Sequence, residues 1–137
     1  MALPEAMTLA TADRRGRPSA RVVLLKHADA DGFGFYTNGR SRKGGELAAN
    51  PHAALVFHWS PLGRQVRVEG SVTQVSEAEA DAYWATRPRA SQLGAVASAQ
   101  SAPVASRAAL MARWRALRRA YRGKPVPRPP HWIGFRV

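Results

Sequence analysis

The order of the predicted elements constrains the fold of this chain more than any other feature of its sequence. Strand patterns joined by short turns fill most of the chain up to residue 75, and the longer helical patterns follow. The predicted strands are Met7–Ala12, Ser19–His27, Phe33–Thr37, His52–Trp59, Gln65–Val75 and the closing segment His131–Val137. The first three predict an antiparallel meander, and Gly70 predicts a bulge or sharp bend in the fifth. Because strands and helices do not alternate as in parallel-sheet proteins, the sequence predicts a mainly β fold of the α+β class, a small antiparallel barrel with flanking helices.

Helices are predicted at three places. The segment Ser41–Ala49 is followed closely by Pro51, which ends a helix because the residue before a proline avoids the helical region. Ser76 opens a capping-box pattern that starts a second helix. The segment Ser106–Arg122 carries apolar residues at spacings of four, three and four, and Gly123 ends it.

Size, charge and cysteine content limit the class of this protein. With 137 residues we expect a single domain over residues 1–137, and without cysteine there are no disulfides and no thiolate metal sites. No apolar stretch approaches the roughly 18 residues that span a bilayer, and the start lacks a signal-peptide pattern, so we expect a cytoplasmic protein without a membrane partner. The net charge of +12 has two explanations of similar weight: an arginine-rich composition with a solvated basic face, or binding of phosphates or a polyanion.

Common catalytic and metal-binding signatures are absent from the sequence. The four histidines have no short paired spacing, so no metal site is expected. The carboxylates are few and scattered, so no acid–base pair is expected and no side chain is assigned a catalytic role. Any chemistry is therefore expected to belong to a bound cofactor.

Basic residues mark both ends of the segment RVVLLK, which runs from Arg21 to Lys26. In a strand, side chains alternate between the two faces, so these two residues point to opposite faces and lie about 16 Å apart. One small anion does not easily satisfy both. Two anionic groups, or the two ends of a long ligand, can do so.

A second basic cluster lies at the start of the first predicted helix. Arg42 and Lys43 follow a glycine-containing loop, and the helix dipole disfavours cations at this position. A bound anion would explain them, and so would simple exposure to solvent; the two explanations have equal weight.

A third cluster combines a phenol, a guanidinium and a hydroxyl. Tyr83, Arg87 and Ser91 recur every four residues, and such groups commonly bind phosphate when they converge. Pro88 breaks a continuous helix, and taken alone this cluster is better explained as a helix end with incidental polar residues.

Taken together, in this order and spacing, the segments RVVLLK, FYTN followed by SRK, RQVRVEG, RPRASQLGA and QS resemble the pyridoxine 5′-phosphate oxidase family over nearly the whole chain. The resemblance implies an antiparallel split β-barrel and a homodimer that holds flavin mononucleotide (FMN) at the subunit interface. It also implies oxidation of the vitamin B6 phosphates, pyridoxine or pyridoxamine 5′-phosphate, to pyridoxal 5′-phosphate, with O2 as the acceptor.

The resemblance also assigns residues to two sites. The FMN-binding residues would be Arg21, Val22, Val23, Leu24, Leu25, Lys26, Tyr36, Thr37, Arg42, Lys43, Gln65, Gln100 and Ser101. The substrate-binding residues would be Lys26, Tyr83, Arg87 and Ser91. In this assignment Arg21 meets the flavin phosphate and Lys26 the substrate phosphate, so two different phosphates explain the two basic ends of RVVLLK.

The chain departs from the family pattern at its end. It stops at HWIGFRV, where relatives continue with a tail that supplies flavin contacts and the Arg and His over the substrate ring. We therefore expect the 137-residue chain to bind both ligands and to oxidise substrate very slowly or not at all.

Two other functions stay open. One is an FMN-binding split-barrel protein that acts on another substrate or has no oxidase activity. The other is a basic nucleic-acid-binding protein that uses the arginine-rich helix Ser106–Arg122, although nucleic acid is not the partner that the family resemblance implies.

Overall fold

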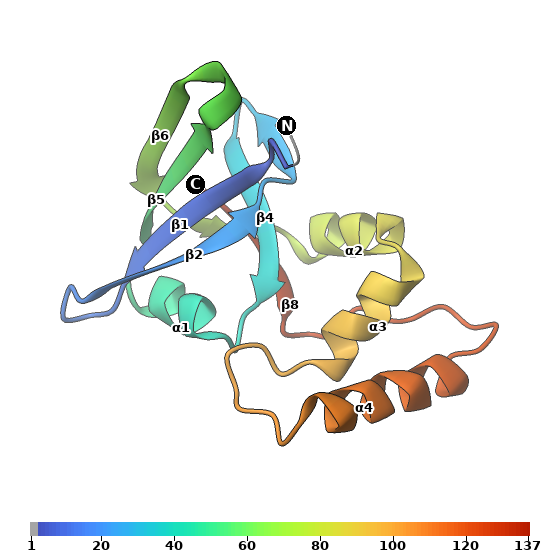
Figure 1. Ribbon diagram of the computed structural model, residues 1–137. Helices are drawn as coiled ribbons and strands as arrows, with labels where there is room; N and C mark the ends of the chain where they lie inside the picture. The colour runs from blue at the N-terminus through green and yellow to red at the C-terminus, as the bar shows by residue number, and fades with distance from the viewer. Residues whose placement is uncertain (1–2) are drawn as a thin grey trace.

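Two four-stranded antiparallel sheets form a split barrel in the computed structural model, which describes residues 3–137 (Figure 1). The first sheet has the order β2-β1-β5-β6, formed by β1 (Ala6–Ala12), β2 (Pro18–Leu24), β5 (His52–Trp59) and β6 (Arg64–Ser71). The second has the order β3-β4-β8-β7, formed by β3 (His27–Asp29), β4 (Gly32–Asn38), β7 (Thr73–Gln74) and β8 (Trp132–Arg136). The mainly β architecture predicted from the order of the elements is confirmed.

The predicted strand Ser19–His27 is wrong as a single strand, because the chain changes sheets within it. The Leu25 amide donates to the Glu5 carbonyl at 2.8 Å, beside β1, and the Lys26 amide donates to the Gly34 carbonyl of β4, also at 2.8 Å. β2 therefore ends in one sheet and β3 begins in the other. The predicted meander of three strands is wrong for the same reason, since β2 pairs with β1 whereas β4 pairs with β3 and β8.

A second change of sheet divides the predicted strand Gln65–Val75 into β6 and β7. The Val72 amide still donates to the Pro51 carbonyl at 2.8 Å, and the chain then pairs with β8. Gly70 is not a bulge, because it pairs with Ala53 in an unbroken register. The bend falls two residues later, at the buried Val72.

The main core lies between the two sheets. Alternation along β1 turns Met7 and Leu9 inward, where they pack with Phe35 of β4 and Leu55 of β5. These four side chains are at most 1% exposed. Full burial of such a side chain contributes about 1.5–3 kcal/mol, so this cluster holds the two sheets together.

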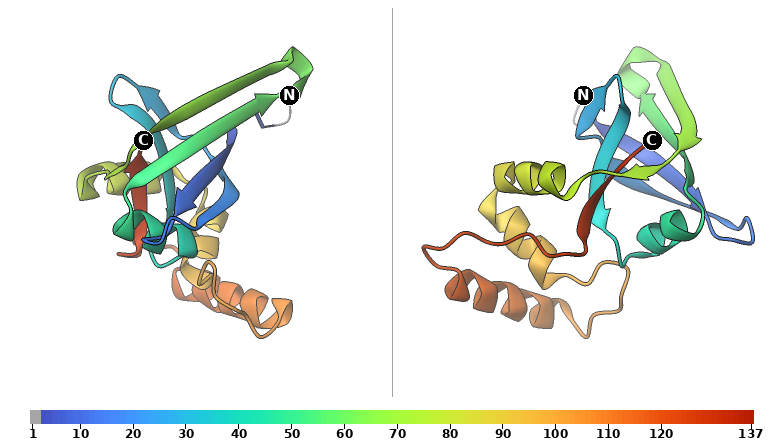
Figure 2. Two further views of the ribbon diagram at one scale, coloured as in Figure 1. Left: turned by 90° about the vertical axis from the view of Figure 1, so that its left-hand side faces the viewer. Right: turned by 180° about the vertical axis from the view of Figure 1, so that it is seen from behind.

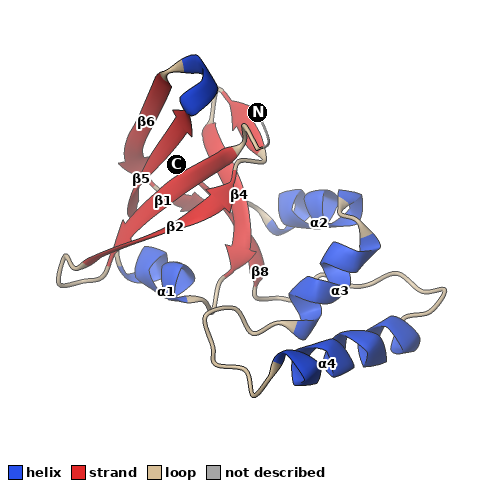
Figure 3. Ribbon diagram, viewed as in Figure 1, coloured by secondary structure: helices blue, strands red, loops and turns tan. Residues whose placement is uncertain are grey.

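The helices lie at the edges of this barrel (Figure 3). They are α1 (Arg42–Ala49), α2 (Glu77–Thr86), α3 (Arg89–Ala97) and α4 (Arg107–Ala120), and a short 3-10 turn, Ser60–Leu62, joins β5 to β6. The three predicted helix starts are confirmed, since Ser41, Ser76 and Ser106 accept hydrogen bonds from backbone amides three residues further on. None of the helices in the described part of the chain is long and apolar enough to cross a membrane.

A second core joins the helices to the sheets. Trp84, Leu93, Val126 and Trp132 form it, and the Trp84 indole donates to the Val126 carbonyl at 2.8 Å. The proline-rich segment after α4 is therefore packed against α2 on its way back to β8 (Figure 2, right). Arg128 within it donates to Trp132 and forms ion pairs with two carboxylates of α2.

Candidate functional site

A cavity of about 720 Å³ opens between β2 of the first sheet, β4 of the second and the helices α1 to α3. Its volume is within the range of small-molecule sites. The lining residues are Ser19, Ala20, Arg21, Val22, Val23, Leu24, Lys26, Tyr36, Thr37, Arg42, Lys43, Tyr83, Thr86, Arg87, Pro88, Ser91, Gln100, Ser101 and Trp132.

All but two of the residues predicted for the two ligand sites line this one cavity. Leu25 instead packs against the core between the sheets. Gln65 is exposed on β6, opposite His58 of β5, and does not reach the cavity of its own chain. The breaking of the helix at Pro88 is observed, yet the residues before and after it still converge on the cavity.

Five lining residues were not predicted from the sequence: Ser19, Ala20, Thr86, Pro88 and Trp132. A signal for Ser19 exists, since it lies two residues before Arg21 and so shares its face of β2. No local pattern indicates Trp132, which reaches the cavity because β8 pairs with β4.

The cavity is lined by five cations, Arg21, Lys26, Arg42, Lys43 and Arg87, and by no carboxylate. Within residues 3–137, ion pairs join two of them to a carboxylate, and both pairs use Glu46 of α1. Five cations against one carboxylate leave four positive charges around one cavity. Such an excess favours the binding of anions.

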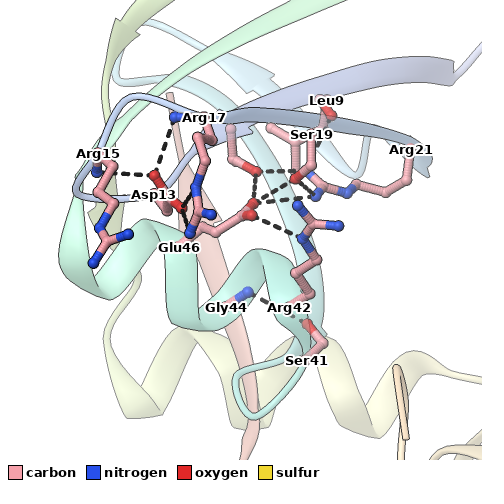
Figure 4. Close-up of polar contacts among 11 residues, drawn as sticks. Leu9, Asp13, Arg15, Arg17, Ser19, Arg21, Ser41, Arg42, Gly44 and Glu46 are labelled. Atoms are coloured by element: carbon pink, nitrogen blue, oxygen red, sulfur yellow. Dashed lines mark hydrogen bonds and ion pairs between the residues drawn. The ribbon is translucent and has the colours of Figure 1, made fainter. Parts of the chain in front are cut away.

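Glu46 connects α1 to the first sheet next to the cavity-lining residues Arg21 and Arg42 (Figure 4). Its carboxylate accepts hydrogen bonds from the Thr11 hydroxyl at 2.5 Å and the Ser19 hydroxyl at 2.6 Å. It also pairs with Arg21 at 3.3 Å and with Arg42 at 2.9 Å. Burial raises the pKa of this carboxyl, but the four hydrogen bonds together lower it to about 2.

The Arg21 guanidinium is held in one orientation by its neighbours. Besides Glu46, it donates to the Leu9 carbonyl at 3.2 Å, the Thr11 hydroxyl at 2.6 Å and the Ser19 hydroxyl at 2.5 Å. Most of its N–H groups are therefore used within the protein, and it supplies a fixed charge to the cavity. Arg42, whose side chain is 66% exposed, uses only its Nε atom and keeps both Nη groups for other partners.

Lys43 is a buried cation in the same part of the cavity. Its ammonium donates to Thr37 at 3.2 Å, to Ser41 at 3.3 Å and to the Gln100 side chain at 2.9 Å. Burial, and to a lesser degree Arg21, lower its pKa. The first turn of α1 can lie close to the preceding loop because Gly44 has no side chain. A Cβ on Gly44 would lie 2.3 Å from the carbonyl oxygen of Gly39 in that loop.

Arg87 is a cation of a different kind, because it has aromatic neighbours and no carboxylate. Its guanidinium carbon lies 4.9 Å from the ring centre of Trp132 and 5.4 Å from that of Trp84. Its Nη1 atom is buried and has no hydrogen-bond partner among the described residues. Burial lowers the pKa of Arg87, and an anion in the cavity would supply the missing acceptor.

Aromatic rings stack beside this guanidinium. Tyr36 lies 4.3 Å from Tyr83 and 4.9 Å from Trp132, ring centre to ring centre, in both cases nearly parallel. His27 meets both tyrosines edge-on and shares a 3.2 Å hydrogen bond with the Tyr36 hydroxyl. Burial, followed by the nearby Glu79, raises the pKa of Tyr36 to about 12, so its hydroxyl stays protonated at neutral pH.

A family model described as pyridoxamine 5′-phosphate oxidase matches residues 1–120. A curated pyridoxine/pyridoxamine 5′-phosphate oxidase of Myxococcus xanthus is 61% identical over 134 residues, which cover 98% of this chain and 65% of that protein. The corresponding protein of Sphingopyxis alaskensis is 61% identical over 132 residues, covering 96% of this chain and 61% of that protein. The chain thus spans less than two thirds of the length of these relatives.

Solved structures have the same fold. PhzG of Burkholderia lata, in complex with tetrahydrophenazine-1-carboxylic acid, superposes with a TM-score of 0.93 at 35% identity and covers 98% of this chain and 65% of its own. A pyridoxamine 5′-phosphate oxidase-related, FMN-binding protein of Nostoc punctiforme superposes with a TM-score of 0.75 at 19% identity, covering 96% of this chain and 70% of its own.

The Glu46 network predicts a specific dependence of stability on pH. Because the folded-state pKa of this carboxyl is lowered from 4.5 to about 2, it stabilises the fold above pH 4.5, and this contribution is lost as the pH falls to about 2. We expect Glu46→Gln to lower the free energy of unfolding by about 3 kcal/mol at pH 7, the order of size for breaking a buried ion pair. Urea unfolding between pH 7 and pH 2 should show the two proteins converging across this window.

A matched control is Glu69→Gln, which removes an exposed carboxylate paired only with the exposed Arg67. This variant should differ little from the unchanged protein at any pH. A Glu46→Gln deficit that stays constant from pH 7 to pH 2 would contradict the role given to Glu46.

Proposed function

Because the chain belongs to the pyridoxamine 5′-phosphate oxidase family, we propose that its cavity binds FMN and a vitamin B6 5′-phosphate for oxidation of the latter to pyridoxal 5′-phosphate with O2. The observation that carries this proposal is the arrangement of charge. One group of cations surrounds Glu46, and another, formed by Lys26 and Arg87, has no carboxylate. Two ligands that each carry one phosphate match two such groups.

The residues of the Glu46 group fit the phosphate of FMN. Arg21, Arg42 and Lys43 against Glu46 leave two positive charges, which balance the two negative charges of a phosphate monoester dianion. In this proposal Arg42 contacts the phosphate through its free Nη groups, while Arg21 and Lys43 add fixed charge. The backbone of β2 from Val22 to Leu24 then follows the flavin.

The second group fits the phosphate of the substrate. The buried Nη1 of Arg87 has no acceptor among the described residues, and Lys26, Tyr83 and Ser91 line the same cavity. A phosphate bound here would accept from two cations and two hydroxyls. The two tryptophan rings hold the guanidinium so that little ordering is needed when the ligand arrives.

The protein and the cofactor have different tasks in this proposal. FMN, when bound, would accept two electrons from the substrate and pass them to O2. The residues of this chain bind the two phosphates and so fix the distance and orientation of the two rings. Positioning of this kind can supply several kcal/mol of catalysis without an acid–base residue.

A second copy of the chain completes the proposed site. Gln65 and Val66 are exposed on the edge strand β6, and Val22, which lines the cavity, is 67% exposed. A two-fold contact that buries Val22 and Val66 would bring Gln65 of one copy to the flavin of the other. The homodimer therefore belongs to the proposal, together with FMN and the vitamin B6 phosphate.

A second candidate function keeps the flavin site and changes the substrate. PhzG shares the fold at a TM-score of 0.93, and its structure holds tetrahydrophenazine-1-carboxylic acid, which has no phosphate. Lys26 and Arg87 distinguish the two candidates, because two cations balance a phosphate dianion better than the single negative charge of a carboxylate.

The first of three predictions from this proposal tests the residues assigned to the phosphate of FMN. Arg42→Ala removes a charge-assisted contact worth about 1.5–3 kcal/mol, so FMN should bind about ten- to a hundredfold more weakly. Titration of flavin fluorescence measures this, with Arg119→Ala as a control that removes an equal charge from exposed surface. Equal affinities of the two variants would exclude Arg42 as a phosphate ligand.

The second prediction tests whether the two sets of cations bind two different phosphates. Arg87→Ala should weaken pyridoxal 5′-phosphate binding by about tenfold or more and leave FMN affinity within about twofold. Absorbance of pyridoxal 5′-phosphate and flavin fluorescence follow the two ligands separately. Joint loss of both ligands would mean that the two groups do not serve two phosphates.

The third prediction concerns the second copy. Val66→Asp places a charge in the proposed contact and should weaken self-association and FMN binding together, whereas Val104→Asp, at a residue 53% exposed in the loop before α4, should change neither. Sedimentation velocity followed at the flavin absorbance measures both properties. A monomer that retains FMN would contradict the shared site.

A further inference from the structure

The positive charge of this protein is concentrated in its last part. After Asp81 the sequence has no acidic residue, while it has eleven lysines and arginines. Only a few of these serve the cavity or the fold: Arg87 lines the cavity, Arg128 and Arg136 form ion pairs, and Arg89 donates to the Tyr121 and Lys124 carbonyls at the end of α4. Most of the remainder lie on or next to α4.

Five arginines form one face of α4 and the turn that follows. At 100° per residue, Arg107, Arg115, Arg118 and Arg119 fall within about 120° of the helix circumference, and Arg122 lies in the turn just after α4; we call these five residues the arginine stripe. All five are exposed, none forms an ion pair within residues 3–137, and none lines the cavity.

The needs of the fold account for only part of the stripe, since Arg118 and Arg119 in the last turn of α4 complement the helix dipole and the other three arginines do not. The face of α4 next to the stripe carries Trp114 and Leu117, which pack against the core around Trp84, and the Trp114 indole donates to the Ala90 carbonyl of α3 at 3.4 Å. The stripe itself brings like charges together at spacings of three and four residues, which destabilises a helix. Arg107 also lies in the first turn, where the helix dipole disfavours a cation.

The stripe matches a phosphate backbone in charge and in length. From Arg107 to Arg119 the helix rises about 18 Å, and each DNA strand carries one phosphate per 3.4 Å of the DNA axis, about five phosphates for a protein helix that lies along that axis. Arginine presents a planar fork that binds phosphate oxygens in pairs. The Arg118 guanidinium already lies 5.7 Å from the ring centre of Trp114, which restricts its motion without neutralising it.

We propose that the arginine stripe of α4 binds the phosphate backbone of nucleic acid, without reading its sequence. An anionic membrane is a poorer match, because the apolar face that an interfacial helix would insert is packed on α3. An acidic protein is also a poorer match, because it would need a row of carboxylates as long as the arginine stripe to pair with it. The proposal does not rest on the proposed oxidase function, because no residue of the stripe lines the cavity.

The test is fluorescence anisotropy of a labelled 20-base-pair DNA duplex with the full chain between 50 and 200 mM salt. The unchanged protein should bind with a log–log salt slope of about −4, corresponding to four or five neutralised phosphates. The variant Arg115→Gln/Arg118→Gln/Arg122→Gln should lose about three units of that slope and keep its FMN affinity. The variant with lysine at the same three positions should keep the slope, because it keeps the charge.

The matched control is Arg14→Gln/Arg15→Gln/Arg64→Gln, which removes the same charge from exposed positions outside α4. It should change the slope by less than one unit. An equal loss in the control and the stripe variant would show that net charge alone causes binding and would overturn the proposal. Failure of the unchanged protein to bind DNA, or binding to phosphatidylserine vesicles in place of DNA, would overturn it as well.

Discussion

The position of one buried carboxylate sets the geometry of the cavity. Glu46 lies on α1, and its partners Thr11, Ser19 and Arg21 lie on β1 and β2, so a single group fixes how the helix meets the sheet. A buried charge is costly unless it is paired and hydrogen-bonded, and Glu46 uses both of its oxygens in four contacts. The helix start that carries Arg42 and Lys43 is therefore held against the strand that carries Arg21. Without this carboxylate, three cations would repel one another at one end of the cavity.

The other end of the cavity depends on the changes of sheet. At Lys26 the chain passes from β2 to the second sheet, and this brings Lys26 near β4 while Arg21 stays with β1. The same sheet contains β8, which carries Trp132 to the ring stack and to Arg87. A split barrel can hold two groups of cations apart because its two sheets supply one wall each.

The sequence predicts where the strands and helices lie better than it predicts which strands pair with one another. Strand-forming residues bounded by turns identify Met7–Ala12 and His52–Trp59 as strands, and serine N-caps identify the helix starts. The apolar run Val22–Leu25 and the alternation through Val72 both continue across the changes of sheet, so neither pattern reveals them. The site was predicted largely by family resemblance, which assigns residues to the two ligands but does not show how the fold holds them in place. Glu46 was absent from that prediction, because in the sequence it looks like any helix-surface glutamate until the fold places it between two arginines.

Arg87 shows how the fold can hold a cationic group in advance of a ligand. An unsatisfied buried donor costs about 1–3 kcal/mol, and burial disfavours the charged form as well. The fold offsets part of this cost with the faces of Trp84 and Trp132, which attract the cation but accept none of its hydrogen bonds. The hydrogen-bonding capacity of the guanidinium therefore stays available at the cavity wall. An anion that supplies the missing acceptor recovers the desolvation cost that the folded protein already carries, and this gain adds to its affinity. The Glu46 group follows the opposite principle, because its arginines are neutralised in part and oriented by a carboxylate. In this chain, a buried counterion and an aromatic cage are two ways to keep cations in place around one cavity.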